Sequence, residues 1–139
     1  MQLTKNFSLN EMTLSETAVR LGIKNEPSDA VIHNLNLLCL KILEPLREML
    51  GKPILITSGY RSPLLNQAIG GAKTSQHVTG NAVDFHVNGM SIEELYQNVK
   101  HSALPYSQVI QEFDRWTHCS YDGTERHEAR RVDNQLRGR

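Results

Sequence analysis

The feature that most constrains this chain is a long amphipathic stretch between Pro27 and Gly51. Ser28 directly after the proline is a typical helix start, and glycine is a typical residue at a helix end. The apolar residues between them recur at the spacing of one helical face: Val31, Leu35, Leu38, Ile42, Leu46 and Met49. The pattern predicts one long helix that ends at Gly51, with Pro45 as a candidate position for a kink.

Shorter patterns on both sides of this stretch predict more helices and a small sheet. Ser8 with Glu11 and Ser91 with Glu94 have the Ser-x-x-Glu form of a capping box, which favours a helix start at each serine. Apolar, β-branched or alternating runs predict strands over 53–57, 82–87, 108–113 and 116–121. The sequence therefore predicts an α+β fold, with a small, mainly antiparallel sheet and flanking helices.

The length and the composition indicate one folded domain. A chain of 139 residues with 39% apolar content is the size of a single compact unit with one core. Residues after Asp122 are charged and poor in large apolar side chains, which favours a mobile tail. We expect a domain over 1–121 and a charged tail over 122–139, with no site in the tail.

The charge balance and the hydropathy argue against several classes of partner. Acidic and basic residues number 15 each, so no net charge draws the chain to nucleic acid or an anionic membrane. No apolar run approaches the roughly 18 residues that cross a bilayer, and the first residues lack the apolar core of a signal peptide. We therefore expect cytoplasmic synthesis without membrane insertion. Cys39 and Cys119 are too few for a disulfide framework and are expected to be packed thiols.

Two histidines and one aspartate are the candidate metal ligands: His77, Asp84 and His118. A catalytic zinc takes three protein ligands of this nitrogen and oxygen type and leaves a fourth position for water, whereas structural zinc sites favour four ligands with thiolates. Gly80 would permit a turn that leads the His77 loop into the strand carrying Asp84. Alternation along its own strand would direct His118 away from Cys119, which is therefore not expected to be a ligand.

The residues around these ligands resemble a known zinc signature. The pattern Ser75-x-His77-x-x-Gly80-x-Ala82-x-Asp84, followed by Trp116-x-His118, is similar to that of D-Ala-D-Ala carboxypeptidases and L-alanyl-D-glutamate endopeptidases. Residues 58–63 and 66–71 also resemble the family's segment ahead of the first zinc histidine, and residues 7–11 resemble the N-terminal entry of its short bacterial and prophage members. The resemblance covers the chain except its tail. It implies a zinc peptidase with the three ligands named above and a fold similar to the hedgehog signalling domain.

The resemblance also implies roles for residues around the metal. Many carboxypeptidase-type members place the carboxylate base three residues before the second zinc histidine, but this chain has Arg115 there, which cannot accept a proton. Glu112, at a position similar to an acidic residue of the hedgehog domain, is the favoured base, and Asp114 is the alternative. Arg61 resembles an arginine that faces the oxyanion or the substrate carbonyl. Ser75 either binds substrate or makes a local turn hydrogen bond.

The function implied is zinc-dependent hydrolysis of a peptide bond next to a D-amino acid, in peptidoglycan stem peptides or precursors. The enzyme would be a carboxypeptidase or an endopeptidase, and a monomer whose partner is the peptide substrate. It would act on precursors in the cytoplasm, or as a phage-type enzyme released to the cell wall by another route. Arg115 leaves an alternative open, a catalytically idle binding or phage structural module of the same fold that keeps zinc for stability.

Overall fold

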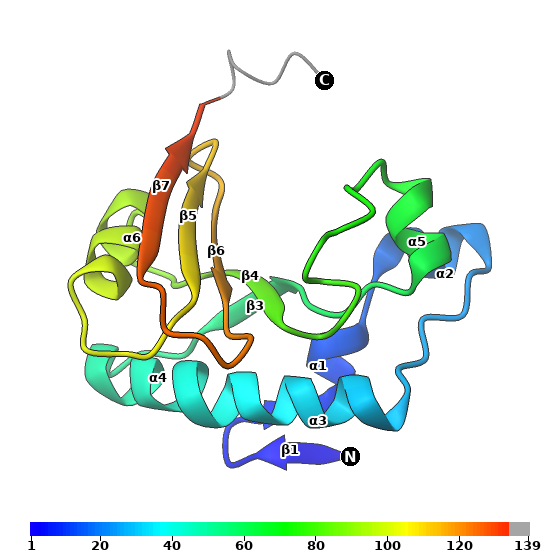
Figure 1. Cartoon of the computed structure of the whole chain (residues 1–139), viewed down its shortest axis with the longest axis horizontal. Helices are drawn as coiled ribbons and strands as arrows, with labels where there is room; N and C mark the ends of the chain where they lie inside the picture. The colour runs from blue at the N-terminus through cyan, green and yellow to red at the C-terminus, as the bar shows by residue number, and fades with distance from the viewer. Residues whose placement is uncertain (134–139) are drawn as a thin grey trace.

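A five-stranded sheet packed against a long helix forms the centre of the computed structural model, which describes residues 1–133 (Figure 1). In spatial order the strands are β3 (Leu55–Ser58), β4 (Ala82–His86), β6 (Trp116–Ser120), β5 (Gln108–Glu112) and β7 (Glu128–Val132). Neighbouring strands are antiparallel except β5 and β7, which are parallel. A separate pair, β1 (Gln2–Thr4) and β2 (Phe7–Ser8), precedes the first helix. The predicted α+β class and the mainly antiparallel pairing are confirmed.

A helix begins after each of the three predicted capping residues, Ser8, Ser28 and Ser91. The helices are α1 (Leu9–Thr13), α2 (Glu16–Leu21), α3 (Asp29–Leu38), the π-helical turn η1 (Cys39–Leu43), α4 (Glu44–Leu50), α5 (Pro63–Ala68) and α6 (Ile92–Lys100). Both capping boxes are formed, at Ser8 with Glu11 and at Ser91 with Glu94. None of the helices within residues 1–133 has the length and the apolar character needed to cross a bilayer.

The long amphipathic stretch forms the continuous helix α3–η1–α4. Ser28 caps its start by accepting a hydrogen bond from a backbone N–H of the first turn, and Gly51 ends it in the left-handed conformation. The π-helical turn lies directly before Pro45, where the amide of Glu44 donates five residues back to Cys39. A proline ring clashes with the carbonyl four residues earlier in a regular α-helix. The wider turn relieves that clash within an unbroken helix.

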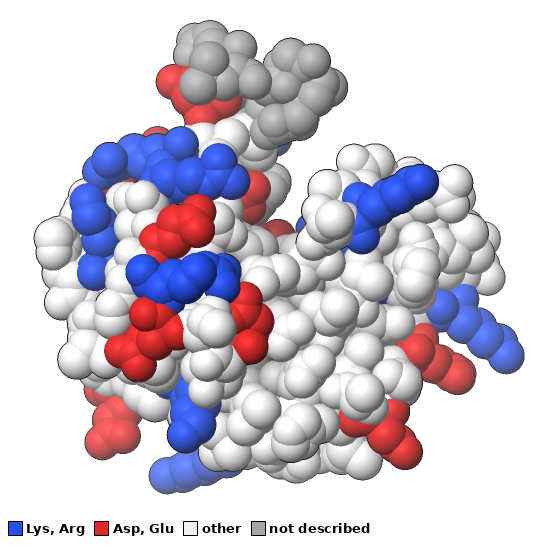
Figure 2. All heavy atoms as spheres, viewed as in Figure 1, with Lys and Arg blue, Asp and Glu red and all other residues white. Residues whose placement is uncertain are grey.

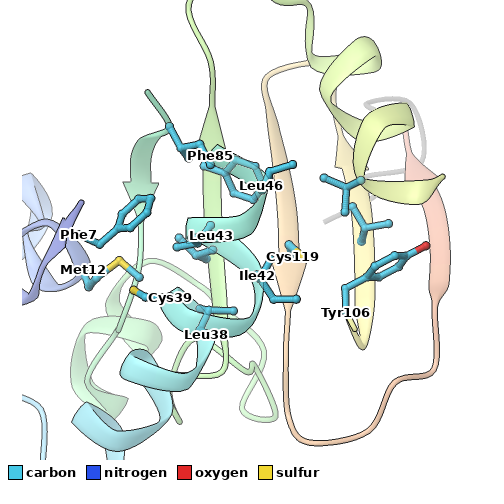
Figure 3. Close-up of a cluster of buried hydrophobic side chains, with 14 of the residues drawn as sticks. Phe7, Met12, Leu38, Cys39, Ile42, Leu43, Leu46, Phe85, Tyr106 and Cys119 are labelled. Carbon is cyan, nitrogen blue, oxygen red and sulfur yellow. The ribbon is translucent and has the colours of Figure 1, made fainter. Parts of the chain in front are cut away.

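The core lies between this helix, one face of the sheet and α6 (Figure 3). Leu38, Ile42 and Leu46 from the helix lie in one buried cluster with Phe85 of β4 and Cys119 of β6. Both cysteines are free and buried, as expected for packed thiols, and burial raises their pKa to about 12. Because side chains alternate along a strand, the opposite face of the sheet is left for polar residues.

The prediction of a mobile tail is wrong for residues 128–132, which form strand β7. This strand extends the sheet by parallel pairing with β5, and Ala129 packs against the core. Arg131 ties the strand to α6 by donating to Glu93. Charged residues therefore form a strand here because backbone hydrogen bonds and one small apolar side chain suffice at a sheet edge. The predicted tail residues 134–139 lie outside the part of the chain that the structure describes.

The loop between α5 and β4 packs against α3 at Gly80. This glycine has a φ of +79°, and a Cβ atom there would lie 2.9 Å from both Cγ1 and the carbonyl oxygen of Val31. Only glycine satisfies both the left-handed backbone and the close contact. The loop that carries His77 is thereby held on the long helix.

Gly80→Ala is expected to lower the free energy of unfolding by about 2–4 kcal/mol, because strain in the left-handed region adds to a clash with the α3 backbone. Gly70→Ala is the matched control, since Gly70 has a φ of +76° and no atom within 4 Å of the added Cβ. Urea denaturation measures both variants. Equal losses of unfolding free energy in the two variants would show that the contact with α3 contributes nothing to stability.

Docking of β7 is expected to depend on pH through Glu93. Hydrogen bonds from Arg131 and Gln97 lower the pKa of Glu93 from its ordinary 4.5 to about 2. A lowered folded-state pKa stabilises the protein above pH 4.5, and this contribution is lost as the pH falls towards 2. Glu93→Gln should cost up to about 1 kcal/mol at pH 6, the range of exposed ion pairs. The difference from the unmutated chain should vanish near pH 2.

Urea unfolding at both pH values tests this dependence on Glu93. Glu48→Gln removes the same charge from α4 and should leave stability unchanged at both pH values. If Glu93→Gln lowered the free energy of unfolding by the same amount at pH 2 and pH 6, the stabilisation would not come from the Glu93–Arg131 ion pair.

Candidate metal centre

Strand pairing places Asp84 and His118 side by side on the polar face of the sheet. The two residues are directly opposite each other in the antiparallel pair of β4 and β6. Paired residues on neighbouring strands direct their side chains to the same face. On the other face, their neighbours Phe85 and Cys119 belong to the core.

His77 reaches the same point from the loop between α5 and β4. Its Nε2 lies 3.2 Å from Oδ1 of Asp84, and Nδ1 of His118 lies 2.9 Å from that oxygen. One ligand atom from each of the three residues lies within 4.8 Å of the others. His77 and Asp84 are only 3% and 4% exposed, and the His118 side chain is 12% exposed. The structure therefore brings the three predicted ligands together in one largely buried group.

The tautomer of His77 is determined by the backbone of Gly59. Nδ1 of His77 lies 2.7 Å from the Gly59 carbonyl oxygen, which can only accept a hydrogen bond, so this nitrogen carries the proton. When the ring is neutral, Nε2 therefore carries a lone pair that faces the carboxylate of Asp84. Two acceptors at this separation require a cation between them, either a proton or a metal ion.

Gly59 is itself held by the first helix. A Cβ atom at this position would lie 2.3 Å from the carbonyl oxygen of Met12 in α1. The amide of Tyr60 donates to the same Met12 oxygen at 2.6 Å. The N-terminal helix thus fixes the carbonyl that orients His77, a link that spacing along the sequence does not show.

Asp84 is ionised in this setting. Burial alone would raise its pKa, but the charges of His77 and His118 and their hydrogen bonds outweigh burial and hold the pKa below its ordinary value. Two imidazoles and one carboxylate are a ligand set for a divalent metal ion in a catalytic site. The donor chemistry, the tautomer of His77 and the convergence of the ligand atoms all fit a bound cation.

Arg61 lies at the edge of the group. Its Nη2 is 3.8 Å from Oδ2 of Asp84, and Nη1 donates to the side chain of Asn66 at 3.1 Å. Burial lowers the pKa of the guanidinium, although Asp84 and Glu112 act in the opposite direction. The predicted arginine is therefore anchored beside the candidate ligands, with its charge directed towards them.

Glu112 lies on the same face of the sheet, next to His118. One of its carboxylate oxygens, Oε2, lies 3.9 Å from Nδ1 of His118 and accepts a hydrogen bond from Nε1 of Trp116 at 2.9 Å. Asp114, the alternative base, lies in the β5–β6 turn with a φ of +58° and accepts from Gln111. It lines a different hollow, so Glu112 is the acid that the structure places beside the group.

Ser75 and Trp116 complete the immediate surroundings. The Ser75 hydroxyl accepts a hydrogen bond from the backbone amide of His77 at 3.2 Å, which matches the local turn role considered for it. Trp116 both lines the groove and holds Glu112. Its role in orienting the acid was missed from the sequence, although the Glu112–Trp116 pairing follows from the predicted β5–β6 hairpin.

These residues line one open groove. It has a volume of about 490 Å³ and contains the three candidate ligands together with Arg61, Glu112 and Trp116. Arg126 and Arg130 from the C-terminal segment also line it. In the space-filling view a notch separates the surface of the sheet from that of α5 and the loop after it (Figure 2). The two arginines were missed because their segment was predicted to be a mobile tail.

Comparisons with known proteins cover most of the chain. The family described as Peptidase M15 matches residues 5–120. A curated relative, the protein translocase subunit SecA of Cyanothece sp., is 49% identical over an alignment of 45 residues that covers 24% of this chain. The chain spans only 5% of that relative, so the likeness is confined to a short segment and no activity is drawn from it.

Zinc is expected to stabilise the protein, because it would bind the folded group and not the unfolded chain. At a free zinc concentration 100-fold above the dissociation constant, the gain should be about 2.7 kcal/mol. Asp84→Asn should abolish the gain, whereas His86→Gln, two residues along the same strand, should retain it. Thermal unfolding with and without zinc, together with the zinc content after dialysis, measures both effects. Equal zinc content in the two variants would rule out this group as the metal site.

Proposed function

The chain belongs to the peptidase M15 family, and on that premise we propose that it is a zinc-dependent peptidase of peptidoglycan stem peptides or precursors. The observation that carries the proposal is the convergence of His77, Asp84 and His118 in a groove that also contains an acid and an arginine. The bond cut would lie next to a D-amino acid. This choice of substrate rests on the resemblance of residues 75–84 and 116–118 to D-Ala-D-Ala and L-alanyl-D-glutamate peptidases.

The metal would be held by Nε2 of His77, a carboxylate oxygen of Asp84 and a ring nitrogen of His118. A bound zinc ion polarises a peptide carbonyl and lowers the pKa of a bound water from 15.7 to about 7. The proton that His77 donates to Gly59 keeps its other nitrogen available as a ligand. Such a hydrogen bond from the second ring nitrogen also orients the ring and raises its basicity.

Glu112 would move the proton in the reaction. Its carboxylate can accept a proton from the attacking water and return it to the leaving nitrogen, because it lies beside the ligand group without being part of it. The indole N–H of Trp116 keeps this carboxylate directed into the groove. Arg61, on the other side of Asp84, would stabilise the negative charge that develops on the carbonyl oxygen.

Glu112→Gln is expected to lower kcat/KM by about 100- to 10,000-fold without changing zinc content, because the amide cannot accept the proton. Asp114→Asn should change kcat/KM less than about threefold, since Asp114 lies in the β5–β6 turn outside the groove. Hydrolysis of purified stem peptides, followed by mass spectrometry of the products, gives both values and identifies the bond cut. Far-UV circular dichroism checks that both variants are folded.

The outcomes separate the proposed enzyme from a binding module of the same fold. One equivalent of zinc without turnover of any D-amino acid peptide would favour an idle module in which the metal serves stability. That reading is suggested by Arg115, which is exposed and takes the position that the resemblance to carboxypeptidase-type members assigns to the base. A loss of turnover in Asp114→Asn, with Glu112→Gln still active, would assign the base to the turn.

A further inference from the structure

The register of the sheet places Arg130 in the same row as the candidate ligands. Asp84 of β4 pairs with His118 of β6, which pairs with Ile110 of β5, which in turn pairs with Arg130 of β7. Paired residues share a face, so all four side chains belong to the polar face of the sheet. Adjacent strands lie about 4.8 Å apart, which puts the Cα atom of Arg130 about 10 Å from that of His118. Ile110 is the buried floor between them.

The charge of Arg130 is not neutralised within the part of the chain that the structure describes. Its side chain makes no hydrogen bond or ion pair with any of residues 1–133, whereas Arg131, its neighbour on the opposite face, is paired with Glu93. Figure 2 shows basic side chains gathered around the β7 side of the sheet. Arg130 thus lines the groove as an exposed, uncompensated cation.

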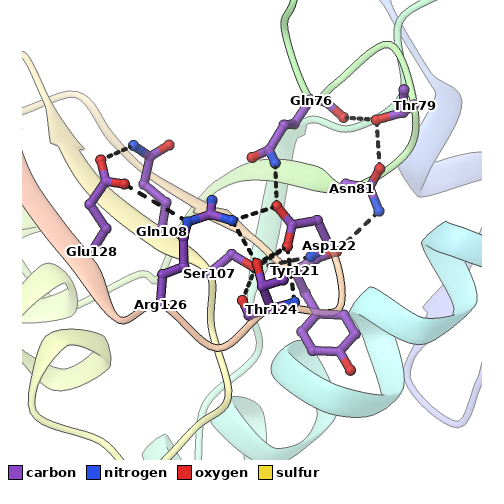
Figure 4. Close-up of polar contacts among 10 residues, drawn as sticks. All are labelled: Gln76, Thr79, Asn81, Ser107, Gln108, Tyr121, Asp122, Thr124, Arg126 and Glu128. Atoms are coloured by element: carbon purple, nitrogen blue, oxygen red, sulfur yellow. Dashed lines mark hydrogen bonds and ion pairs between the residues drawn. The ribbon is translucent and has the colours of Figure 1, made fainter.

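Arg126 lies in the same groove but is already neutralised. Its Nη1 donates to Oδ2 of Asp122 at 2.9 Å, and Gln76, next to His77 in the sequence, donates to the same oxygen at 2.9 Å (Figure 4). Burial would raise the pKa of Asp122, but hydrogen bonds from Thr124 and Arg126 outweigh it, so the carboxyl group stays ionised. This network joins the segment before β7 to the loop that carries His77. The arginine side of the groove is therefore held in place relative to the ligands.

The acids on this face of β5 and β7 have other partners. Glu112 accepts from Trp116, and Glu128 accepts from Gln108 at 2.7 Å. Arg61 lies with Asp84 on the β3–β4 side of the row, away from β7. An anion entering on the β7 side would meet the guanidinium of Arg130 first.

We propose that Arg130 binds a carboxylate of the peptide substrate and so makes the enzyme selective for acidic peptides. This inference rests on the proposed peptidase function, because it names a feature of the substrate in the same groove. Arginine suits the role because its planar guanidinium binds a carboxylate through two parallel hydrogen bonds. An extended peptide advances about 3.3 Å per residue, so the carboxylate would belong to a residue about one to three positions from the bond cut.

Arg126 and Arg130 both lie beyond residue 120, where the match to the family ends. The acidic selectivity would therefore be a property added by the C-terminal segment of this chain. The residues proposed above for metal binding and hydrolysis all lie within the matched region. The activity and the selectivity can accordingly be separated by substitution.

The test compares matched peptides that differ only by Glu against Gln, with the acid placed in turn at each of three positions on either side of the bond cut. At the preferred position, the unmutated chain should show a kcat/KM about 5- to 30-fold higher for the Glu peptide. Arg130→Gln should bring this ratio close to one, and Arg130→Lys should retain part of it. Arg115→Gln, which removes an equal charge from the exposed β5–β6 turn, should leave the ratio unchanged.

Binding is measured separately from turnover through Trp116, the single tryptophan of the chain and a residue of the groove. Titration of the zinc-loaded protein with the same peptides should quench or shift its fluorescence, with tighter binding of the Glu peptide that is lost in Arg130→Gln. Binding that depends on Arg130 without any hydrolysis would overturn the peptidase function and retain the carboxylate site. Hydrolysis with a ratio insensitive to Arg130→Gln would overturn the carboxylate site and retain the peptidase. The carboxylate site would also be overturned if the Glu and Gln peptides gave equal kcat/KM and equal affinity, or if neither peptide bound.

Discussion

The antiparallel pairing of β4 with β6 is the interaction on which the rest of the structure depends. It sets Asp84 opposite His118 on one face and, one residue further along each strand, places Phe85 and Cys119 in the core. The apolar contacts with the long helix stabilise the register, because a shift by one residue would turn Asp84 and His118 towards the core and Phe85 and Cys119 away from it. The same hydrogen-bonded ladder therefore positions both the core side chains and the candidate centre.

Much of this arrangement could be predicted from local patterns. Alternation over 82–87 and 116–121 predicted both central strands, and the spacing of His77, Asp84 and His118 together with the family resemblance predicted the group that the structure brings together. Capping boxes and the apolar stripe predicted the helices because those signals depend on neighbours a few residues apart. Helix starts and strand positions of this kind depend on residues that are neighbours along the chain, so they can be predicted from one sequence.

The features that the sequence did not predict depend on contacts between distant segments of the chain. Strand β7 carries a charged sequence whose tendency to form a strand appears only when β5 offers its backbone edge. The carbonyl that orients His77 comes from Gly59, whose position is set by Met12 in the first helix. The π-helical turn before Pro45 is another example, because the helical pattern predicts a kink there but cannot indicate how the helix absorbs it.

Strand β7 also has a consequence for self-association. It is an edge strand of the sheet, and its exposed Glu128, Arg130 and Arg131 place charge along that edge. Charged side chains on an edge oppose the addition of a strand from a second molecule. Without β7, the edge would be β5, whose central residues Val109, Ile110 and Gln111 are buried. The C-terminal segment thus covers a strand that would otherwise be a template for aggregation, and a chain shortened at the end of β6 would be expected to precipitate.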